Sequence, residues 1–191
     1  MRRVSLWMQM SLDGYTEGPN GEFDWPIVNK ELHTYFVDEL RAMGAFLYGR
    51  KVYDGMVAFW PTADTDPSST ALQAEYARRG SPCPRSSSRG PSSTSSGIPR
   101  WSARTSWKQI TKLKHQPGGG LVLFGGADIA STFMRLGLID EYRLFVHPVV
   151  LGGGTPLFPG SDERAKLTLV EARTFDSAVV HVRYQRADEG R

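Results

Sequence analysis

LVLFGGADIASTFMRLGLIDEYRLFVHPVVLGGGTPLF, residues 121–158, is the stretch that decides the fold class of this chain. Its apolar run from Leu121 to Phe124 ends in Gly125-Gly126, and an amphipathic segment follows as far as Gly137. A second apolar run, Tyr142 to Leu151, leads into three further glycines. Strand, glycine turn, helix and strand within about thirty residues predict an α/β unit.

Two glycine turns stand where a predicted strand passes into a helix. One is Gly125-Gly126-Ala127-Asp128, and the other is Gly49-Arg50-Lys51, which follows the apolar residues 45–48. Backbone amides at such turns approach a phosphate without interference from a Cβ atom, and a helix N-terminus favours negative charge. Both turns are therefore candidate phosphate sites. A tight-packing turn, or ordinary solvated cations at a helix start, would give the same pattern.

The remaining periodicity predicts a mainly parallel sheet covered by helices, closed by a hairpin through Asp176-Ser177. We expect strands at 4–10, 45–48, 121–124, 140–150, 167–174 and 178–184, and helices at 30–43, 49–58, 108–115 and 128–136.

Length and composition favour one domain, which we place at residues 1–187 with a short tail at 188–191. No apolar run approaches the roughly 18 residues of a membrane span, and we interpret MRRVSLWMQMSLDG as a first strand rather than a signal peptide. The single Cys83 excludes an internal disulfide framework and indicates a cytoplasmic protein. One cysteine with four scattered histidines gives no metal-ligand spacing.

The formal net charge of +3 is concentrated in one block. Residues 81–107 hold four arginines and no acidic residue, so they carry +4 and the rest of the chain carries −1. A basic surface for nucleic acid therefore has little support. A hydrolase has no support either, because neither a Gly-x-Ser-x-Gly motif nor a recognisable catalytic triad occurs.

The same block, SPCPRSSSRGPSSTSSGIPRWSARTSW, has an anomalous composition, with ten serines, four prolines and almost no aliphatic residues. Such a composition usually means a disordered loop, but an insertion of this length is uncommon inside a compact domain. Serine codons of the TCN type become NTC after a shift of one base, and NTC encodes valine, leucine, isoleucine or phenylalanine. Residues 83–108 then give VPKVVVSRTLEHVEWNSTVVREDVVE. We hypothesise that two compensating frameshifts bracket the block; the alternative is a genuine flexible Ser/Pro-rich loop.

Four motifs on both sides of this block resemble one known family. They are VSLWMQMSLDGY (residues 4–15), LYGRKVYDGM (47–56), the DEYRLFVHPVVLGGGTPLF part of the opening stretch (140–158) and KLTLVEARTFDSAVVHVRY (166–184). Together they resemble the reductase domain of riboflavin-biosynthesis deaminase-reductases and its free-standing bacterial relatives. The resemblance implies a three-layer α/β/α domain of the dihydrofolate reductase type, with a C-terminal antiparallel hairpin. It also implies NADPH as cofactor.

The resemblance assigns roles to both glycine turns. Gly49, Arg50 and Lys51 match the family's phosphate-contacting turn, and Gly125 to Asp128 match its glycine pair beside the pyrophosphate. A VSRT strand end in the family adds contacts to the adenosine phosphate, and the corresponding residues here fall within 81–107.

Substrate contacts are predicted around the end of the first strand. Asp13 follows that strand, where a carboxylate could hydrogen-bond the edge of a heterocycle or relay a proton as hydride arrives. An Asx turn closing on Gly14 is the alternative for Asp13. The other candidates are Ser11, the aromatic residues Trp25, Tyr53 and Trp60, which could equally be core, and Gly152 and Gly153, which a merely flexible loop would also explain.

The function expected from these residues is hydride transfer from NADPH to a pteridine- or ribosylaminopyrimidine-like heterocycle. The alternative is a non-catalytic ligand-binding or scaffold protein of the same fold. The riboflavin step itself is one option only, because the chain lacks the deaminase domain of the full enzyme. Because residues 143–151, RLFVHPVVL, are unusually apolar for a sheet edge and relatives are commonly dimers, we also predict a homodimer through the later strands.

Overall fold

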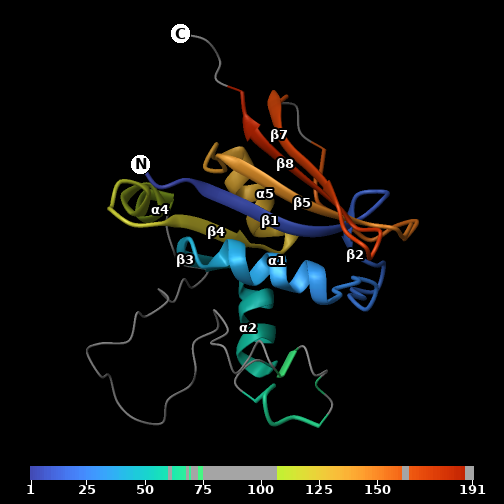
Figure 1. The fold of residues 1–191 in the computed structure, drawn as a ribbon. Helices are drawn as coiled ribbons and strands as arrows, with labels where there is room; N and C mark the ends of the chain where they lie inside the picture. Colours follow the sequence, from blue (N-terminus) through green and yellow to red (C-terminus); the bar gives the residue numbers. More distant parts are fainter. Residues whose placement is uncertain (60–61, 68, 70–72, 75–106, 161–163, 188–191) are drawn as a thin grey trace.

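The structure is a computed structural model that describes residues 1–59, 62–67, 69, 73–74, 107–160 and 164–187. Its centre is a six-stranded sheet with the order β3-β4-β1-β5-β8-β7 (Figure 1). The first four of these strands are parallel, and β8 and β7 continue the sheet in antiparallel fashion. The strands are β1 Val4–Ser11, β3 Met43–Tyr48, β4 Gly120–Phe124, β5 Glu141–His147, β7 Leu167–Thr174 and β8 Val180–Arg186.

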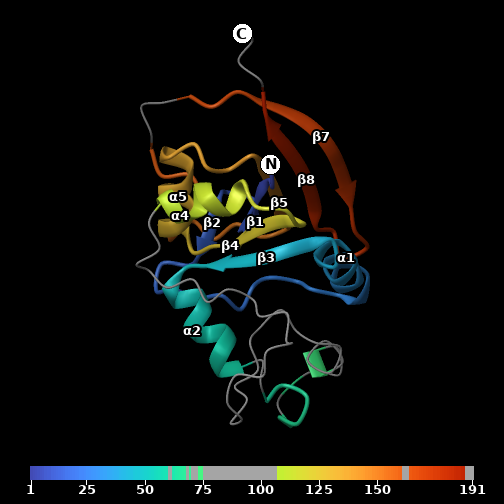
Figure 2. The same cartoon turned by 90° about the vertical axis from the view of Figure 1, so that its left-hand side faces the viewer.

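Helices cover both faces of this sheet. Helices α4 (Trp107–Lys114) and α5 (Ala127–Arg135) lie on one face, and α1 (Lys30–Leu40) lies on the other (Figure 2). Helix α2 (Arg50–Phe59) packs its first turns on the same cluster as α1. The predicted three-layer α/β/α architecture is therefore confirmed. None of the helices in the described ranges is long and apolar enough to cross a membrane.

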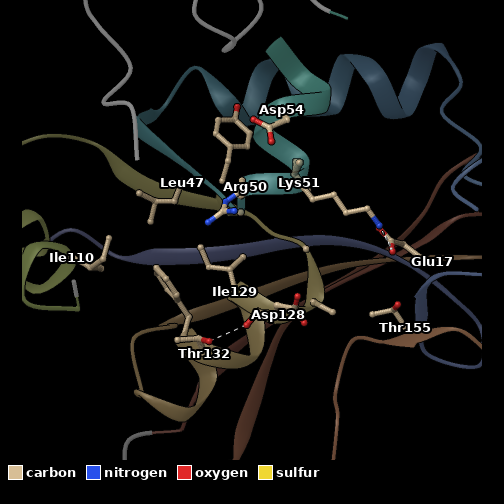
Figure 3. A pocket seen from close by; sticks show the side chains of 16 residues that line it. Glu17, Leu47, Arg50, Lys51, Asp54, Ile110, Asp128, Ile129, Thr132 and Thr155 are labelled. Atoms are coloured by element: carbon tan, nitrogen blue, oxygen red, sulfur yellow. Dashed lines mark hydrogen bonds and ion pairs between the residues drawn. The ribbon is translucent and has the colours of Figure 1, made fainter. Parts of the chain in front are cut away.

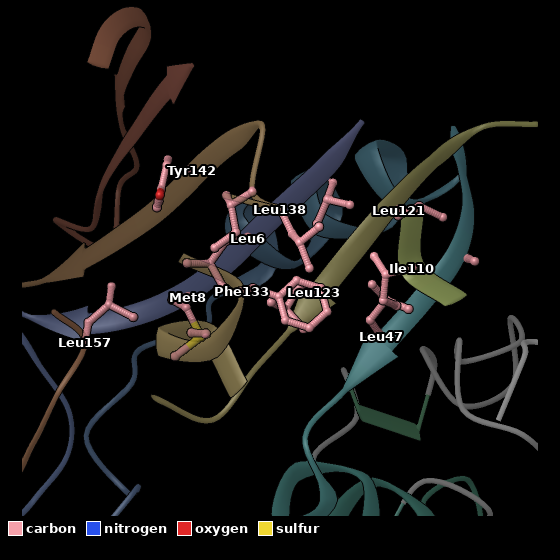
Figure 4. Close-up of a cluster of buried hydrophobic side chains, with 14 of the residues drawn as sticks. Leu6, Met8, Leu47, Ile110, Leu121, Leu123, Phe133, Leu138, Tyr142 and Leu157 are labelled. Carbon is pink, nitrogen blue, oxygen red and sulfur yellow. The ribbon is translucent and has the colours of Figure 1, made fainter. Parts of the chain in front are cut away.

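Alternation along the strands divides the core into two. In β1, Leu6 and Met8 face α4 and α5, whereas Trp7 between them faces α1. Strand β4 repeats the pattern, with Leu121 and Leu123 on one side and Val122 on the other. The first cluster is mainly aliphatic, with Phe133 and Tyr142 as its aromatic members (Figure 4), and the second is rich in aromatic rings. This period-2 pattern with apolar residues on both faces is what a doubly covered parallel sheet requires.

Local signals in the sequence set the helix ends. Helix α1 begins after Asn29, whose side chain accepts a hydrogen bond from Leu32 N at 3.0 Å. Helix α5 ends at Arg135, and Gly137 follows its C-cap with φ at +62° and an amide that donates to Met134 O. Leu138 N then donates to Phe133 O, which completes a Schellman motif and explains why the helix stops where the sequence indicated.

A buried charge cluster, which the sequence did not reveal, fastens α1 to the sheet. Arg143 is 4% exposed and lies over the Trp7 ring, donating to the 2% exposed Glu141 at 2.6 Å and to Glu39 of α1. Burial raises the pKa of Glu141, but hydrogen bonds from Arg143 and Arg183 outweigh it, so the pKa lies below its usual value. Removing one member of such a cluster leaves an uncompensated buried charge.

The expectation that residues 143–151 form a sheet edge is wrong. Strand β5 lies between β1 and β8, and it pairs with β1 from Glu141 to His147 and with β8 from Glu141 to Val146. Its apolar composition reflects burial on both faces of an interior strand. The edge on this side of the sheet is β7, which is exposed along almost all of its length.

Strand β3 forms the opposite edge of the described sheet, pairing there with β4 alone. Ala45 to Tyr48 are nevertheless buried, so β3 has the composition of an interior strand. The frameshift hypothesis concerns residues 81–107, all but Trp107 of which lie outside the described residues, and it stays a hypothesis. A buried edge strand of this composition, paired on one side within the described residues, is what the loss of a neighbouring strand would leave.

If the frameshift hypothesis holds, a chain carrying VPKVVVSRTLEHVEWNSTVVREDVVE over residues 83–108 should melt at a higher temperature and bind NADPH more tightly. Three serines replaced by buried valines are worth about 5–9 kcal/mol at roughly 1.5–3 kcal/mol each, a large share of a domain's roughly 5–15 kcal/mol. Differential scanning calorimetry of both chains tests this. Cooperative melting of both at one temperature would identify the block as a tolerated loop.

Candidate functional site

The site lies where the parallel strands end. Strands β3 and β4 are neighbours, with Tyr48 opposite Phe124 in register, so Gly49 and Gly125 follow at the same edge of the sheet. The two turns touch, because a Cβ built on Gly49 would lie 3.1 Å from Ile129 Cγ2 and 3.5 Å from Gly126 N. Adjacent parallel strands that each lead into a helix thus bring two helix N-termini together, the usual position of ligand sites in α/β sheets.

A pocket of about 810 Å³ opens between these helix starts (Figure 3). Its volume falls within the roughly 300–1,000 Å³ typical of ligand sites. Six of the seven predicted cofactor residues line it, namely Gly49, Arg50, Lys51, Gly126, Ala127 and Asp128. Gly125 does not. A Cβ there would point at Ala130, Ile129 and Met8 within the core, so this glycine serves packing.

The N-terminus of α5 lies at the pocket without a side-chain cap. Gly126 is the N-cap of α5, and no side chain caps the helix there. A Cβ on Gly126 would meet only Val52 Cγ2, at 4.0 Å, so the position opens into the pocket and not into the core. The first amides of a helix, with its dipole, favour an anion at such a place. Arg50 begins the facing helix and makes no ion pair within the described ranges.

A short second sheet, absent from the sequence prediction, completes the pocket. Strand β2 (Tyr15–Glu17) pairs with β6 (Thr155–Pro156), which places Glu17 opposite Thr155. Both residues line the pocket, at the end away from Leu47 and Ile110 (Figure 3). Strands of two or three residues carry no periodicity, so their only signals were the glycines around TEG and GGGTP.

Asp13 and Ser11 lie beside this second sheet and do not line the pocket. The Asp13 carboxylate accepts from Leu151 N at 3.1 Å and from Gly152 N at 2.8 Å, and so ties the end of β1 to the glycine loop. Hydrogen bonding, from Ser11 first, lowers the pKa of Asp13. The Asx-turn alternative does not describe this turn, since Gly14 N donates to Ser11 O instead. Ser11 Oγ is buried and accepts from Tyr15 N.

The remaining predicted substrate residues lie in separate places. Gly152 has open space around it, and a Cβ on Gly153 would lie 3.7 Å from Pro19 Cγ. Trp25 packs edge-on against His147, and its buried indole N–H finds no acceptor among the residues described. Tyr53 packs against Tyr48 in the aromatic core. Trp60 lies outside the described residues. The structure therefore brings Asp13, Ser11 and the glycine loop together, but not the aromatic residues.

His147 fixes the segment that carries Trp25. Its Nδ1 accepts from Ile27 N at 3.0 Å, which leaves the proton on Nε2 to donate to Gln9 Oε1 at 2.7 Å. Burial lowers the pKa of His147 to about 4, and burial with the nearby arginines does the same for His181. No group of three or more potential metal ligands occurs in the described residues.

Comparison with solved structures defines the class of fold. A protein provisionally named for riboflavin biosynthesis, from Shewanella sp. PV-4, superposes with a TM-score of 0.66 at 22% identity, covering 97% of this chain and 99% of that one. RibD from Acinetobacter baumannii gives 0.58 at 18% identity, and the chain spans 58% of it while 98% of this chain is covered. Dihydrofolate reductase from Enterococcus faecalis, complexed with NADP(H) and RAB-propyl, gives 0.58 at 16%, covering 97% of both chains. The fold is thus dihydrofolate reductase-like, as predicted.

Sequence comparison defines the family. A model described as the RibD C-terminal domain matches residues 105–181. The uncharacterized protein YyaP of Bacillus subtilis (strain 168) is 36% identical over 187 residues, which cover 96% of this chain and 94% of YyaP. The chain belongs to the RibD C-terminal domain family.

The two buried histidines predict a loss of stability in mild acid. Each has a folded pKa near 4 against about 6.5 when unfolded, so only the unfolded chain gains these protons as pH falls from 6.5. Their contribution is complete above pH 6.5 and should shrink by about 1–2 kcal/mol per histidine by pH 5. Urea unfolding of the wild type at pH 7 and pH 5 measures this loss.

His147→Asn provides the control, because the amide oxygen can still accept from Ile27 N but does not titrate. The variant should lose less stability between pH 7 and pH 5 than the wild type. An equal loss in both proteins would show that His147 is not responsible.

Proposed function

We propose that this protein is an NADPH-dependent reductase that transfers hydride to a pteridine- or ribosylaminopyrimidine-like heterocycle. The observation that carries the proposal is the convergence of two glycine-opened helices, α2 and α5, on one 810 Å³ pocket at the strand ends. Family membership and the fold shared with a reductase complexed with NADP(H) support it.

The residues present fit a dinucleotide. The uncapped first turn of α5 at Gly126, with Ala127 and Asp128, would hold the pyrophosphate, and Arg50 would neutralise it from the opposite helix. The free space beside Gly126 is a cradle that a Cβ atom would fill. Gly49 serves a different purpose, because a Cβ atom there would lie only 3.1 Å from Ile129 Cγ2 and the Ile129 side chain would have to shift to accept it.

The two ends of the pocket differ in character. Leu47 and Ile110 give one end an apolar lining that suits the adenine ring. Thr155 gives the other end a hydroxyl that suits the ribose and carboxamide next to the nicotinamide. When bound, the cofactor supplies the hydride, and the protein contributes position and exclusion of water.

We further propose that Asp13 orients the substrate. Its lowered pKa keeps the carboxylate ionised, and an ionised carboxylate accepts hydrogen bonds from the amino and imino edge of a heterocycle. Through Leu151 N and Gly152 N, Asp13 also holds the loop that contains Gly152 and Gly153. Ser11 stabilises the same turn, because its Oγ accepts a hydrogen bond from Tyr15 N. Trp25 and Tyr53 remain proposed ring contacts on the aromatic side.

The rival proposal is a non-catalytic ligand-binding protein of the same fold. A screen of NADPH oxidation over pterins, folates and ribosylaminopyrimidines distinguishes the two. Turnover of one substrate class supports the reductase. A ligand that stays tightly bound, without any NADPH oxidation across the screen, favours the binding protein.

Gly126→Val should weaken NADPH binding far more than it destabilises the fold. The new side chain would enter the phosphate cradle, whereas a Cβ atom at this position meets only Val52 Cγ2, at 4.0 Å, within the described residues. Loss of the glycine N-cap costs at most about 1 kcal/mol of stability. Calorimetric titration with NADPH and a thermal melt of the same sample give both quantities.

Gly160→Val is the matched control, because that glycine also has open space around it but does not line the pocket. It should leave NADPH affinity unchanged. A folded Gly126→Val protein with wild-type affinity would remove Gly126 from the cofactor site.

We propose a homodimer formed through the β7–β8 hairpin. Strand β5 is interior to the sheet and therefore offers no edge for this contact. Leu167, Leu169 and Ala172 of β7 pair with residues of β8 on the α5 side of the sheet, and all three are exposed. The outer edge of β7 pairs with no strand in the described chain. An apolar face beside a free edge suits a second copy related by a two-fold axis.

Sedimentation velocity at micromolar concentration should therefore show a dimer, and Leu169→Asp should shift it toward monomer. Leu12→Asp is the control, because this leucine is also exposed, at 67% against 53%, but lies in the turn after β1 and outside the hairpin. A wild-type monomer at these concentrations would contradict the homodimer.

A further inference from the structure

One of the two cations in the pocket already has a partner. Lys51 Nζ lies 3.0 Å from Glu17 Oε1 and 2.9 Å from Oε2, so it donates to both oxygens of one carboxylate. The pair crosses from α2 to β2 at the polar end of the pocket (Figure 3). Lys51 is 76% exposed and Glu17 is 24% exposed, so the lysine is the free-moving member and the glutamate is the fixed one.

The backbone holds Glu17 in place. It pairs with Thr155 across the short β2–β6 sheet, and Thr16 Oγ1 donates to Thr155 O beside it at 3.1 Å. Gly154 packs directly beneath, with φ at +125° and so close that a Cβ there would collide with the carbonyl oxygen of Glu17. The carboxylate is thus delivered to the pocket by a rigid connection.

Carboxylates outnumber cations among the residues that line the pocket. The cations are Arg50 and Lys51, and the carboxylates are Glu17, Asp54 and Asp128. Asp128 lies in the first turn of α5, where the helix dipole favours it. Glu17 lies on strand β2 and not at a helix N-terminus. Its ion-pair partner is Lys51, which a bound phosphate would also use.

We propose that Glu17 is an internal competitor for the anion-binding groups of the pocket. Its carboxylate occupies Lys51, so a phosphate-bearing ligand must displace it to gain the second cation. Glu17 thereby lowers the affinity for anions and leaves Arg50 and the two helix starts as the primary anchor. This inference rests on the proposed dinucleotide site and adds to it a residue that limits how tightly the site holds its ligand.

The magnitude follows from the exposure of the pair. Exposed ion pairs are worth little, so displacing Glu17 should weaken anion binding by about two- to fivefold and not by orders of magnitude. The screening length of charges in solution falls from roughly 10 Å at 0.1 M salt to roughly 3 Å at 1 M salt. The effect should therefore be largest at low ionic strength.

The test is calorimetric titration of the full chain with inorganic pyrophosphate at low and high salt. Glu17→Gln, which keeps the shape of the side chain but not its charge, should bind pyrophosphate about two- to fivefold more tightly than wild type at low salt. The gain should shrink at high salt. Asp38→Asn is the control, because it removes the same charge from another exposed ion pair, on α1 away from the pocket, and should change nothing.

Equal or weaker pyrophosphate binding by a folded Glu17→Gln protein would overturn the inference, as would an equal gain in Asp38→Asn. Weaker pyrophosphate binding by Glu17→Gln would mean that Glu17 positions Lys51 for the ligand. Failure of the proposed function is measured separately, by titrating wild-type protein with NADPH, so the two outcomes cannot be confused.

Discussion

The close approach of the turns after β3 and β4 is the constraint on which the site depends. Gly49 lies against Ile129 and the amide of Gly126, and even a Cβ atom there would press on the Ile129 side chain at 3.1 Å. Parallel pairing of the two strands sets this contact, and the contact in turn sets the separation of the α2 and α5 N-termini. A bulkier turn would push the two helices apart and separate the amides that together face the pocket. The strongest anion-attracting feature of the protein is thus a product of backbone packing, with charged side chains added around it.

The second wall of the pocket has a different origin. Strands β2 and β6 are short and lie outside the main sheet, and their position depends on specific contacts such as those of Asp13 and Gly154. The aromatic side of the sheet is likewise held by particular groups, with Arg143 fastening α1 and His147 fastening the segment before it. Pairing within the main sheet therefore positions one side of the site, and individual contacts between particular residues position the other.

The sequence predicted the regular elements well, because their signals are local and repeated. The apolar residues 121–124, the glycine at 137 and the amphipathic spacing of 128–136 each indicate one structure, and β4 and α5 agree with them within a residue or two. The two glycine turns were predicted together as phosphate sites, and the structure places them together. Such agreement follows from strand pairing, which places the turns of neighbouring parallel strands at one edge.

Where the prediction failed or was silent, the deciding interaction was not local. The sequence RLFVHPVVL suggests an exposed edge strand only because composition does not reveal which strands lie beside it. Pairing with β8 makes this strand an interior one. Arg143 is buried in the middle of that strand only because Glu141 and Glu39 surround it, and they come from two different elements. Glu17 was not proposed, since its role depends on a lysine 34 positions away. The aromatic residues Trp25 and Tyr53 are dispersed for the same reason.

The position of β3 has a consequence for handling the protein. In the described chain its outer backbone groups face no strand, although its side chains are those of a sheet interior. Lysine, proline and bulges, the devices that usually discourage edge-to-edge association, are absent from MGAFLY apart from one register shift near its start. Newly synthesised chains that meet before folding is complete can therefore add strands to one another along this edge. Yield of native protein should consequently fall as the expression level rises and improve on dilution during refolding.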